Sequence, residues 1–298
     1  MRQSSHSASR VLVVGLAALA AVACASDPPA PPVATPGLEL GAARAPLGGP
    51  IDMTFRFVVA DDAPPFPEDY RVLVHFVGPD GRMMWADDHD PPTPTTAWQP
   101  GQFVEYTRTE FLPIYPYVGP ASIYVGLYDA AGGSRAPLAG DDNGQREYRV
   151  AGLELLPQTD NGIVVFEEGW HAPEIVGINP SVEWQWTRGD AAVSIPNPRR
   201  DVTLYLQLDQ PGLVFKEPQT VTIAIGEDRI DVFTLAPGPR ELHRIPITAA
   251  ELGDDDMVRI DILVDKTFVP ALLAPDTSTD ARELGVRVFH LFVQPDEG

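Results

Sequence analysis

YRVLVHFVGPDGRMMWA, residues 70–86, consists of two apolar runs separated by four turn residues. The first run, Tyr70–Val77, is rich in β-branched and aromatic residues, which is typical of a strand. In the segment Gly78-Pro79-Asp80-Gly81, proline restricts φ and glycine permits positive φ, so a tight turn is expected. Arg82–Ala86 then serves as the returning strand. The stretch therefore predicts an antiparallel β-hairpin.

Runs of the same kind continue on both sides of this hairpin. Helical periodicity is nearly absent, and the chain of 298 residues contains 32 prolines and 25 glycines. Short strands at this spacing, with turn residues between them, predict an immunoglobulin-like β-sandwich for the first half. Its further strands are expected at Ile51–Val59, Phe103–Phe111, Ser122–Tyr128 and Arg146–Leu155.

A second set of strands follows a boundary expected between Pro157 and Gly162. Gly226-Glu227-Asp228 lies between two alternating runs and predicts a hairpin loop. Thr248 and Glu251 have capping-box spacing, which predicts one helical turn. The larger number of strands and the long connection over 270–283 indicate a jelly-roll-like sandwich. The main expected strands are Val182–Trp186, Ala191–Ile195, Val202–Asp209, Gln219–Ile225, Arg229–Leu235, Glu241–Ile247, Val258–Val264 and Val286–Val293.

The first 24 residues have the features of an export signal. Arg2 and Arg10 are basic, Val11–Ala23 is apolar and made mostly of small residues, and Cys24 is the only cysteine in the sequence. Such a segment is typical of a secretory signal and too short for a spanning helix. Its end resembles the lipobox of bacterial lipoproteins, in which the cysteine is acylated. The alternative is an ordinary signal cleaved nearby, which would leave a periplasmic or secreted protein.

Residues 24–36 are rich in proline and predict an extended, disordered tether. The expected organisation is therefore all-β: a signal peptide over 1–23, the tether over 24–36, and two tandem β-sandwich domains over 37–157 and 158–298. In a diderm bacterium, Ala25 after the lipidated cysteine resembles the signal for outer-membrane sorting, so the expected location is the cell envelope.

The chain is strongly acidic, with a formal net charge of −21. This balance argues against nucleic acid as a partner, because phosphates require a basic footprint. It also argues against electrostatic attachment to anionic lipids. The membrane is expected as a partner only through an N-terminal lipid.

One region has a more specific pattern. His75, the turn Asp80-Gly81, the loop 87–92, the run 95–101 (TTAWQPG) and the strand 125–129 (VGLYD) occur in that order. The order resembles a β-sandwich module found at the C-terminal ends of bacterial membrane glycosyltransferases and in other envelope proteins. The resemblance covers about residues 50–150, and the second half has a looser likeness to similar segments. It implies an accessory, non-catalytic role, and no catalytic residue carries over.

Four tryptophans are candidate ligand-binding residues: Trp85, Trp98, Trp184 and Trp186. An exposed indole face can stack on a sugar ring. Trp184 and Trp186 are two residues apart on an expected strand, so they project from one face. If that face is exposed it forms a binding platform, and if it faces inward both are core residues.

Asp87, Asp88 and Asp90 are candidate calcium ligands, because calcium requires several oxygen atoms. The alternative is a solvated turn in which the carboxylates bond backbone amides. His75 is expected to be a half-buried, hydrogen-bonded structural residue. The sequence contains no nucleophile elbow, zinc motif or phosphate-binding loop, so no catalytic residue and no cofactor other than calcium is expected.

These observations favour a membrane-anchored envelope lipoprotein that binds a glycan or another envelope polymer without catalysis. One alternative is a protein-interaction or scaffold subunit of an envelope complex. The other is a glycoside hydrolase, which needs two carboxylates facing one cleft. Exposure of the tryptophans discriminates among the binding hypotheses.

Overall fold

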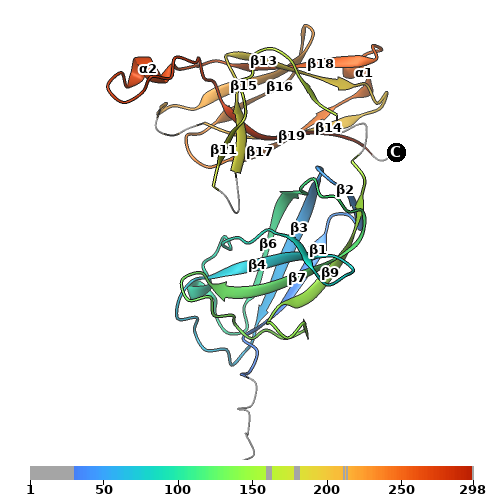
Figure 1. Cartoon of the computed structure of the whole chain (residues 1–298), viewed down its shortest axis with the longest axis vertical. Coiled ribbons are helices and arrows are strands. Elements are labelled where there is room, and N and C mark those ends of the chain that lie inside the picture. Colours follow the sequence, from blue (N-terminus) through green and yellow to red (C-terminus); the bar gives the residue numbers. More distant parts are fainter. Residues whose placement is uncertain (1–29, 159–162, 178–181, 211, 213, 297–298) are drawn as a thin grey trace, which may run out of the picture. The chain divides into compact units, whose positions relative to one another are not determined.

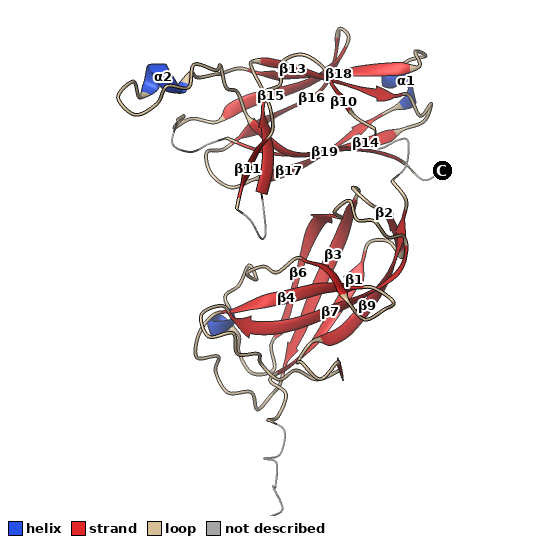
Figure 2. Cartoon of the chain, in the orientation of Figure 1, coloured by secondary structure: helices blue, strands red, loops and turns tan. Residues whose placement is uncertain are grey.

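The computed structural model describes residues 30–158, 163–177, 182–210, 212 and 214–296. The signal segment over 1–23 and Cys24 lie outside these residues. In the described part, no helix has the length and apolar character needed to cross a bilayer. Strands dominate, and the helical segments are short (Figure 2): η1 (Thr95–Ala97), α1 (Ala249–Leu252) and α2 (Pro270–Leu273).

The first half forms a sandwich of two sheets (Figure 1). One sheet has the order β1-β3-β6, and the other has the order β2-β9-β7-β4-β5, with β8 paired to β9. This is the immunoglobulin-like arrangement, and it confirms the predicted fold class. The strands are β1 (Ala34–Leu40), β2 (Arg44–Pro46), β3 (Pro50–Val59), β4 (Tyr70–Val77), β5 (Met83–Ala86), β6 (Phe103–Phe111), β7 (Gly119–Asp129), β8 (Asp141–Asp142) and β9 (Tyr148–Leu156).

Alternation along the strands builds the core of this sandwich. On β3, Met53, Phe55 and Phe57 are fully buried, and the residues between them face outward. The predicted β4–β5 hairpin is present, with Gly81 at φ 76° in its turn. The returning strand begins at Met83, which pairs with Val77, and a register shift follows because Phe76 pairs with Trp85.

The predicted tether over 24–36 is too long at its C-terminal end. β1 begins at Ala34, which pairs with Val59 of β3, and the Ala34 side chain is buried in the core. Pro36 is tolerated inside this strand because β1 is at the edge of its sheet, where a missing N–H breaks no ladder. The proline-rich composition predicted disorder here, because composition carries no information about whether a segment pairs with a distant strand.

The second half forms a ten-stranded sandwich with orders β10-β13-β18-β15-β16 and β11-β12-β19-β14-β17. If the eight strands from β12 to β19 are numbered 1 to 8, one sheet contains the order 1-8-3-6 and the other contains the order 2-7-4-5. This is the jelly-roll arrangement, as predicted. The strands are β10 (Val165–Phe166), β11 (Glu174–Val176), β12 (Val182–Trp186), β13 (Asp190–Pro196), β14 (Val202–Asp209), β15 (Gln219–Ile225), β16 (Asp228–Leu235), β17 (Glu241–Ile247), β18 (Met257–Val264) and β19 (Arg287–Pro295).

Each sandwich closes around its own cluster of buried apolar side chains. Two local predictions in the second sandwich are confirmed. Thr248 and Glu251 form a capping box at the start of α1, and Gly226, at φ 58°, turns the chain from β15 into β16. The exact domain boundaries at 157 and 158 stay a prediction.

Candidate functional site

The loop after β5 does not gather its carboxylates around one point. Asp87 contacts Arg108, with 3.2 Å between Oδ1 and Nη2. Asp88 Oδ1 accepts a hydrogen bond from a backbone amide of β4, and Asp90 forms an ion pair with Arg71 at 3.0 Å. Within the described residues, no group of three or more His, Cys, Asp or Glu side chains is arranged to hold a metal ion. Each of the three side chains has a different partner here, and calcium binding by Asp87, Asp88 and Asp90 stays a prediction.

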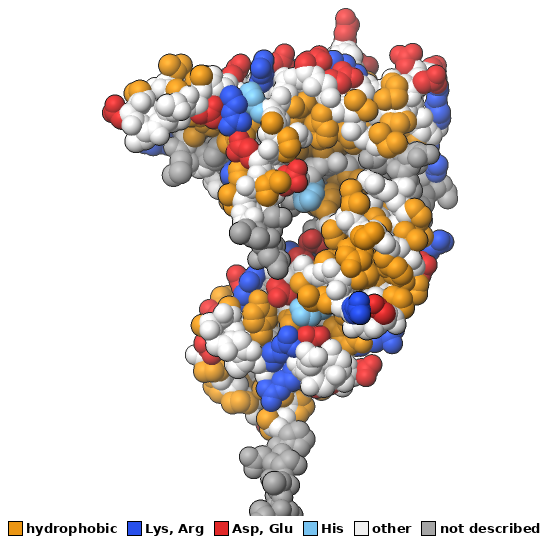
Figure 3. All heavy atoms as spheres, viewed as in Figure 1, with side chains coloured by type: hydrophobic (Ala, Val, Ile, Leu, Met, Phe, Trp, Pro, Cys, Tyr) orange, Lys and Arg blue, Asp and Glu red, His pale blue; other side chains and the backbone are white. Residues whose placement is uncertain are grey.

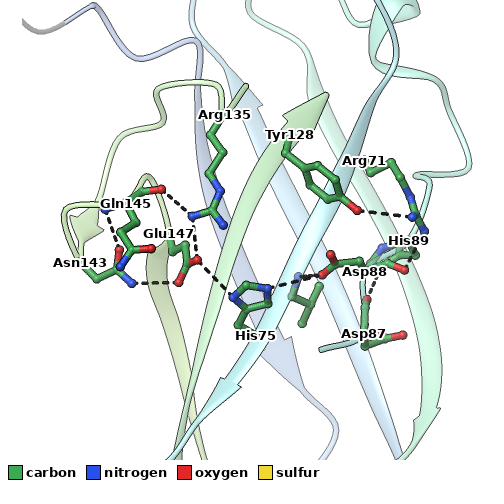
Figure 4. A network of polar contacts seen from close by, with 11 residues as sticks. Arg71, His75, Asp87, Asp88, His89, Tyr128, Arg135, Asn143, Gln145 and Glu147 are labelled. Atoms are coloured by element: carbon green, nitrogen blue, oxygen red, sulfur yellow. Dashed lines mark hydrogen bonds and ion pairs between the residues drawn. The ribbon is translucent and has the colours of Figure 1, made fainter. Parts of the chain in front are cut away.

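His75 lies at the centre of a polar network on the outer face of β4 (Figure 4). Its Nδ1 is 3.2 Å from Glu147 Oε1, and its Nε2 is 3.9 Å from Asp88 Oδ1. Arg135 also contacts Glu147, at 2.7 Å. The His75 side chain is 13% exposed, as expected for a half-buried residue with polar partners. The network joins two loops to the sheet, so we interpret it as structural.

A second polar cluster, between the end of β5 and β6, was not anticipated from the sequence. Arg108 Nη2 is 3.2 Å from Asp87 and 3.7 Å from Glu110, so one guanidinium serves two carboxyl groups. Burial, together with the neighbouring Asp87, raises the pKa of Glu110 to about 8, and burial also raises the pKa of Asp87. Asp87 Oδ2 is buried without a partner. A protonated Glu110 supplies the donor that this oxygen lacks.

His89 packs beside this cluster as a neutral imidazole. Its Nδ1 is 3.1 Å from the Asp87 carbonyl oxygen, and its Nε2 is 2.8 Å from the Tyr106 hydroxyl. A carbonyl oxygen can only accept, so Nδ1 carries the proton and Nε2 accepts from tyrosine. Burial lowers the pKa of His89 to about 4, which agrees with this neutral form. The sequence signal that could have revealed this cluster is the alternation along β6. It places Tyr106, Arg108 and Glu110 on the same face as the buried Val104.

Of the two predicted tryptophans of the first sandwich, Trp98 is buried and Trp85 is partly exposed. Trp98 is 3% exposed, and its Nε1 donates to the Thr93 carbonyl oxygen at 3.0 Å. Trp85 stacks on Phe76, with ring centroids 4.6 Å apart, and its indole N–H is buried. The structure therefore removes Trp98 as a candidate sugar platform, because a buried indole in the core presents no face to a ligand. One face of the Trp85 ring is covered by Phe76.

Trp184 and Trp186 lie on one face of β12, as predicted, and they meet an arginine there. The register places Trp186 opposite Arg287 of β19. The guanidinium carbon of Arg287 is 5.4 Å from the Trp184 ring and 5.7 Å from the Trp186 ring. Trp186 is 8% exposed and belongs to the packed interior, whereas Trp184 is partly exposed. Of the predicted pair, Trp184 remains available.

Two arginines of this face have different surroundings. Arg287 forms a bidentate ion pair with Asp209, with Nε–Oδ1 2.8 Å and Nη2–Oδ2 2.7 Å, and Asp209 is buried. Arg240, just before β17, lies 3.8 Å above the ring of Phe289. Within the described part of the chain, Arg240 has no ion pair or side-chain hydrogen bond. Burial and the charge of Arg287 lower the pKa of Arg240, and Asp209 opposes this.

A cleft opens where β12 and β19 part. The two strands share only the pairs Gln185–Val288 and Trp186–Arg287, after which β12 continues with β11 and β19 with β14. In Figure 1 the hairpin of β11 runs at a steep angle to β19. The cleft has a volume of about 500 Å³. Its lining includes Glu183, Trp184, Gln185, Arg240, Phe289 and His290.

A bulge directs Phe289 toward this cleft. In the β14–β19 ladder, Gln207 pairs with His290 and Leu208 pairs with Val288, so Phe289 is the extra residue. A bulge changes the direction of a side chain and is frequent beside binding sites. The Phe289 and Trp184 rings are 6.1 Å apart at 47°. The sequence contained no signal for this bulge, because it depends on the pairing partner.

No protein-family model and no curated protein matches the sequence. Among solved structures, the chain is similar to the CBM22-1–CBM22-2 tandem domain of Paenibacillus barcinonensis Xyn10C, with 8% identity, 88% of this chain and 91% of that chain covered, and a TM-score of 0.25. It is also similar to the CBM36-1 domain of a xylanase from the hindgut metagenome of Trinervitermes trinervoides, with 10% identity, 46% and 99% coverage, and a TM-score of 0.27.

A third similar structure is the DNA-bound alkylpurine DNA glycosylase AlkC of Pseudomonas fluorescens. It shares 16% identity over 43% of this chain, with a TM-score of 0.27, and the chain spans about a third of it, 31%. TM-scores this low identify neither a family nor a ligand.

Proposed function

We propose that this protein binds a glycan without cleaving it, in the cleft between β12 and β19. The observation that supports this proposal is the partly exposed pair Trp184 and Phe289, with Arg240 and Gln185 beside it. Sugar rings have apolar faces that pack on aromatic rings and hydroxyls that bond to amides and charged groups. The cleft combines both kinds of group.

The acid content of the cleft supports a binding role over hydrolysis. A glycosidase needs two carboxyl groups on either side of the scissile bond. Among the described residues that line the cleft, Glu183 is the single acid. One carboxyl group lacks the second partner that glycoside hydrolysis requires.

The test is glycan binding by the full mature chain, first on an array and then by isothermal titration. Trp184→Ala removes one stacking surface, and we expect binding to weaken about tenfold or more, which corresponds to roughly 1.4 kcal/mol. Phe289→Ala is a second variant that leaves β12 intact. Phe103→Ala is the matched control, because Phe103 is 56% exposed on the other sandwich.

Wild-type binding that both cleft variants weaken, and that Phe103→Ala leaves unchanged, supports the proposal. Equal affinity of the wild type and both cleft variants for the same glycan would contradict it. Circular dichroism of each variant separates loss of the site from loss of the fold.

We also propose, from residues 1–24 alone, that the chain is exported and anchored to an envelope membrane by a lipid on Cys24. This places the binding cleft at the cell envelope, where polysaccharides are abundant.

A further inference from the structure

We infer that the glycan bound in this cleft carries an anionic group, a carboxylate or a sulfate or phosphate ester, and that Arg240 is the residue that recognises it. This inference rests on the proposed glycan-binding function. It concerns the class of sugar, which the aromatic rings alone do not determine.

The first argument is the charge balance around Phe289. Two guanidinium groups approach its ring, Arg240 at 3.8 Å and Arg287 at 5.5 Å. Asp209 is the carboxylate beside them, and its two oxygens are both taken by Arg287. One positive charge therefore remains unpaired in the described surroundings of the cleft, although the chain as a whole has a formal net charge of −21.

The second argument is that the other titratable groups of the cleft do not neutralise Arg240. The pKa of His290 is lowered by desolvation and by the nearby positive charge of Arg240, so this imidazole adds no negative charge to the cleft. Glu183 also lines the cleft but is exposed, and within the described residues it forms no ion pair with Arg240. Arg240 is exposed, so a ligand anion in the cleft can reach its guanidinium.

The third argument is geometric. A guanidinium is a planar fork that matches two oxygens of a carboxylate or phosphate. The Arg240 guanidinium lies 3.8 Å above the Phe289 ring, and Phe289 is 6.1 Å from Trp184, so the charge lies close to the aromatic pair. A sugar ring stacked on the aromatic pair would hold an acidic substituent near this fork.

The acidic surface of the protein does not prevent such binding. Acidic side chains are spread over the visible face rather than gathered in one patch (Figure 3). At physiological ionic strength, charges more than about 8 Å apart are largely screened. Short oligosaccharides are therefore better probes than long polyanions.

The experiment uses the full mature chain on an array that contains neutral, uronic-acid, sulfated and phosphorylated glycans. The best acidic ligand is then compared by titration with its neutral counterpart: the methyl ester for a uronic acid, or the unsubstituted sugar for a sulfate or phosphate ester. We expect the neutral counterpart to bind at least tenfold more weakly. The array also shows which kind of anion is preferred.

Variants assign the preference to one residue. Arg240→Gln should abolish the preference for the acidic ligand and retain weak binding of the neutral one, whereas Arg240→Lys should retain part of the preference. Arg82→Gln is the matched control, because the Arg82 side chain is 88% exposed in the β4–β5 turn. The preference should also decrease with added salt.

The results separate the two proposals. Equal binding of the acidic and neutral counterparts, or an unchanged preference in Arg240→Gln, overturns the inference and leaves the glycan-binding proposal intact. If no glycan on the array binds, both proposals fail. Loss of both ligands in Trp184→Ala, with loss of the preference alone in Arg240→Gln, supports both.

Discussion

At the scale of single residues, the decisive property is whether a charged group has found a partner. Both carboxylate oxygens of Asp209 accept hydrogen bonds from Arg287, so this ion pair stabilises the sheet. Arg240 is held by an aromatic ring instead of a carboxylate. Asp87 and Glu110 share one arginine, which leaves one of the two carboxyl groups protonated. These differences separate structural groups from a candidate binding group.

The Glu110 carboxyl group predicts an unusual dependence of stability on pH. Its pKa is raised from 4.5 to about 8 in the folded state. Between these values the folded state keeps a proton that the unfolded state has lost, so the free energy of unfolding falls as pH rises from about 5 to 8. At about 1.4 kcal/mol per pKa unit, Glu110→Gln should remove roughly 3 kcal/mol of this fall, because the neutral amide does not titrate.

The measurement is urea denaturation of the wild type and Glu110→Gln at several pH values across that range. Glu105→Gln is a suitable control, because its side chain is 42% exposed on the same strand. A pH profile that is the same in the wild type and in Glu110→Gln would show that this carboxyl group does not stay protonated.

At the scale of elements, turns and bulges determine where side chains can go. The β4–β5 turn and the capping box of α1 depend on residues within four positions of one another, and both are present as predicted. The Phe289 bulge and the parting of β12 from β19 depend on strands that are far apart in sequence. Those features create the cleft.

Gly169 provides a test of element packing. It lies before β11 with φ +85°, and a Cβ atom there would meet the Asp190 carbonyl oxygen and the Ala191 Cα of β13. Gly169→Ala should therefore lower the free energy of unfolding by roughly 2 kcal/mol or more, because backbone strain and a clash with backbone combine. Gly144→Ala, at φ +90° with open space, should cost about 1 kcal/mol.

Thermal denaturation of both glycine variants distinguishes the strain of a positive φ from the clash with the backbone of β13. Equal destabilisation by Gly169→Ala and Gly144→Ala would mean that the close approach to β13 contributes nothing.

At the scale of the whole molecule, both sandwiches are maintained by burial alone, since the sequence has no cysteine beyond Cys24 and thus no disulfide within the chain. Each sandwich has its own apolar cluster. The first carries the His75 network, and the second carries the candidate binding cleft.

Attachment through Cys24 is tested on the whole chain in a bacterial host. Cys24→Ala should abolish palmitate labelling and move the protein from the membrane fraction to the soluble fraction, because the thiol is the acylation site. Cys24→Ser is the isosteric control and should behave like Cys24→Ala. An unlabelled, soluble wild type would instead indicate a periplasmic or secreted protein and would shift ligand screens to soluble sugars.

The sequence by itself determined the all-β class, the hairpin at residues 70–86 and the capping box at Thr248. These depend on alternation and turn chemistry, which act between neighbouring residues. Tertiary structure alone decided that Trp98 is core and Trp184 is partly open, that Asp87 meets Glu110, and that Arg240 lies over Phe289. Those outcomes depend on which strands pair and where they part, and residue spacing along one strand carries no information about its distant neighbours.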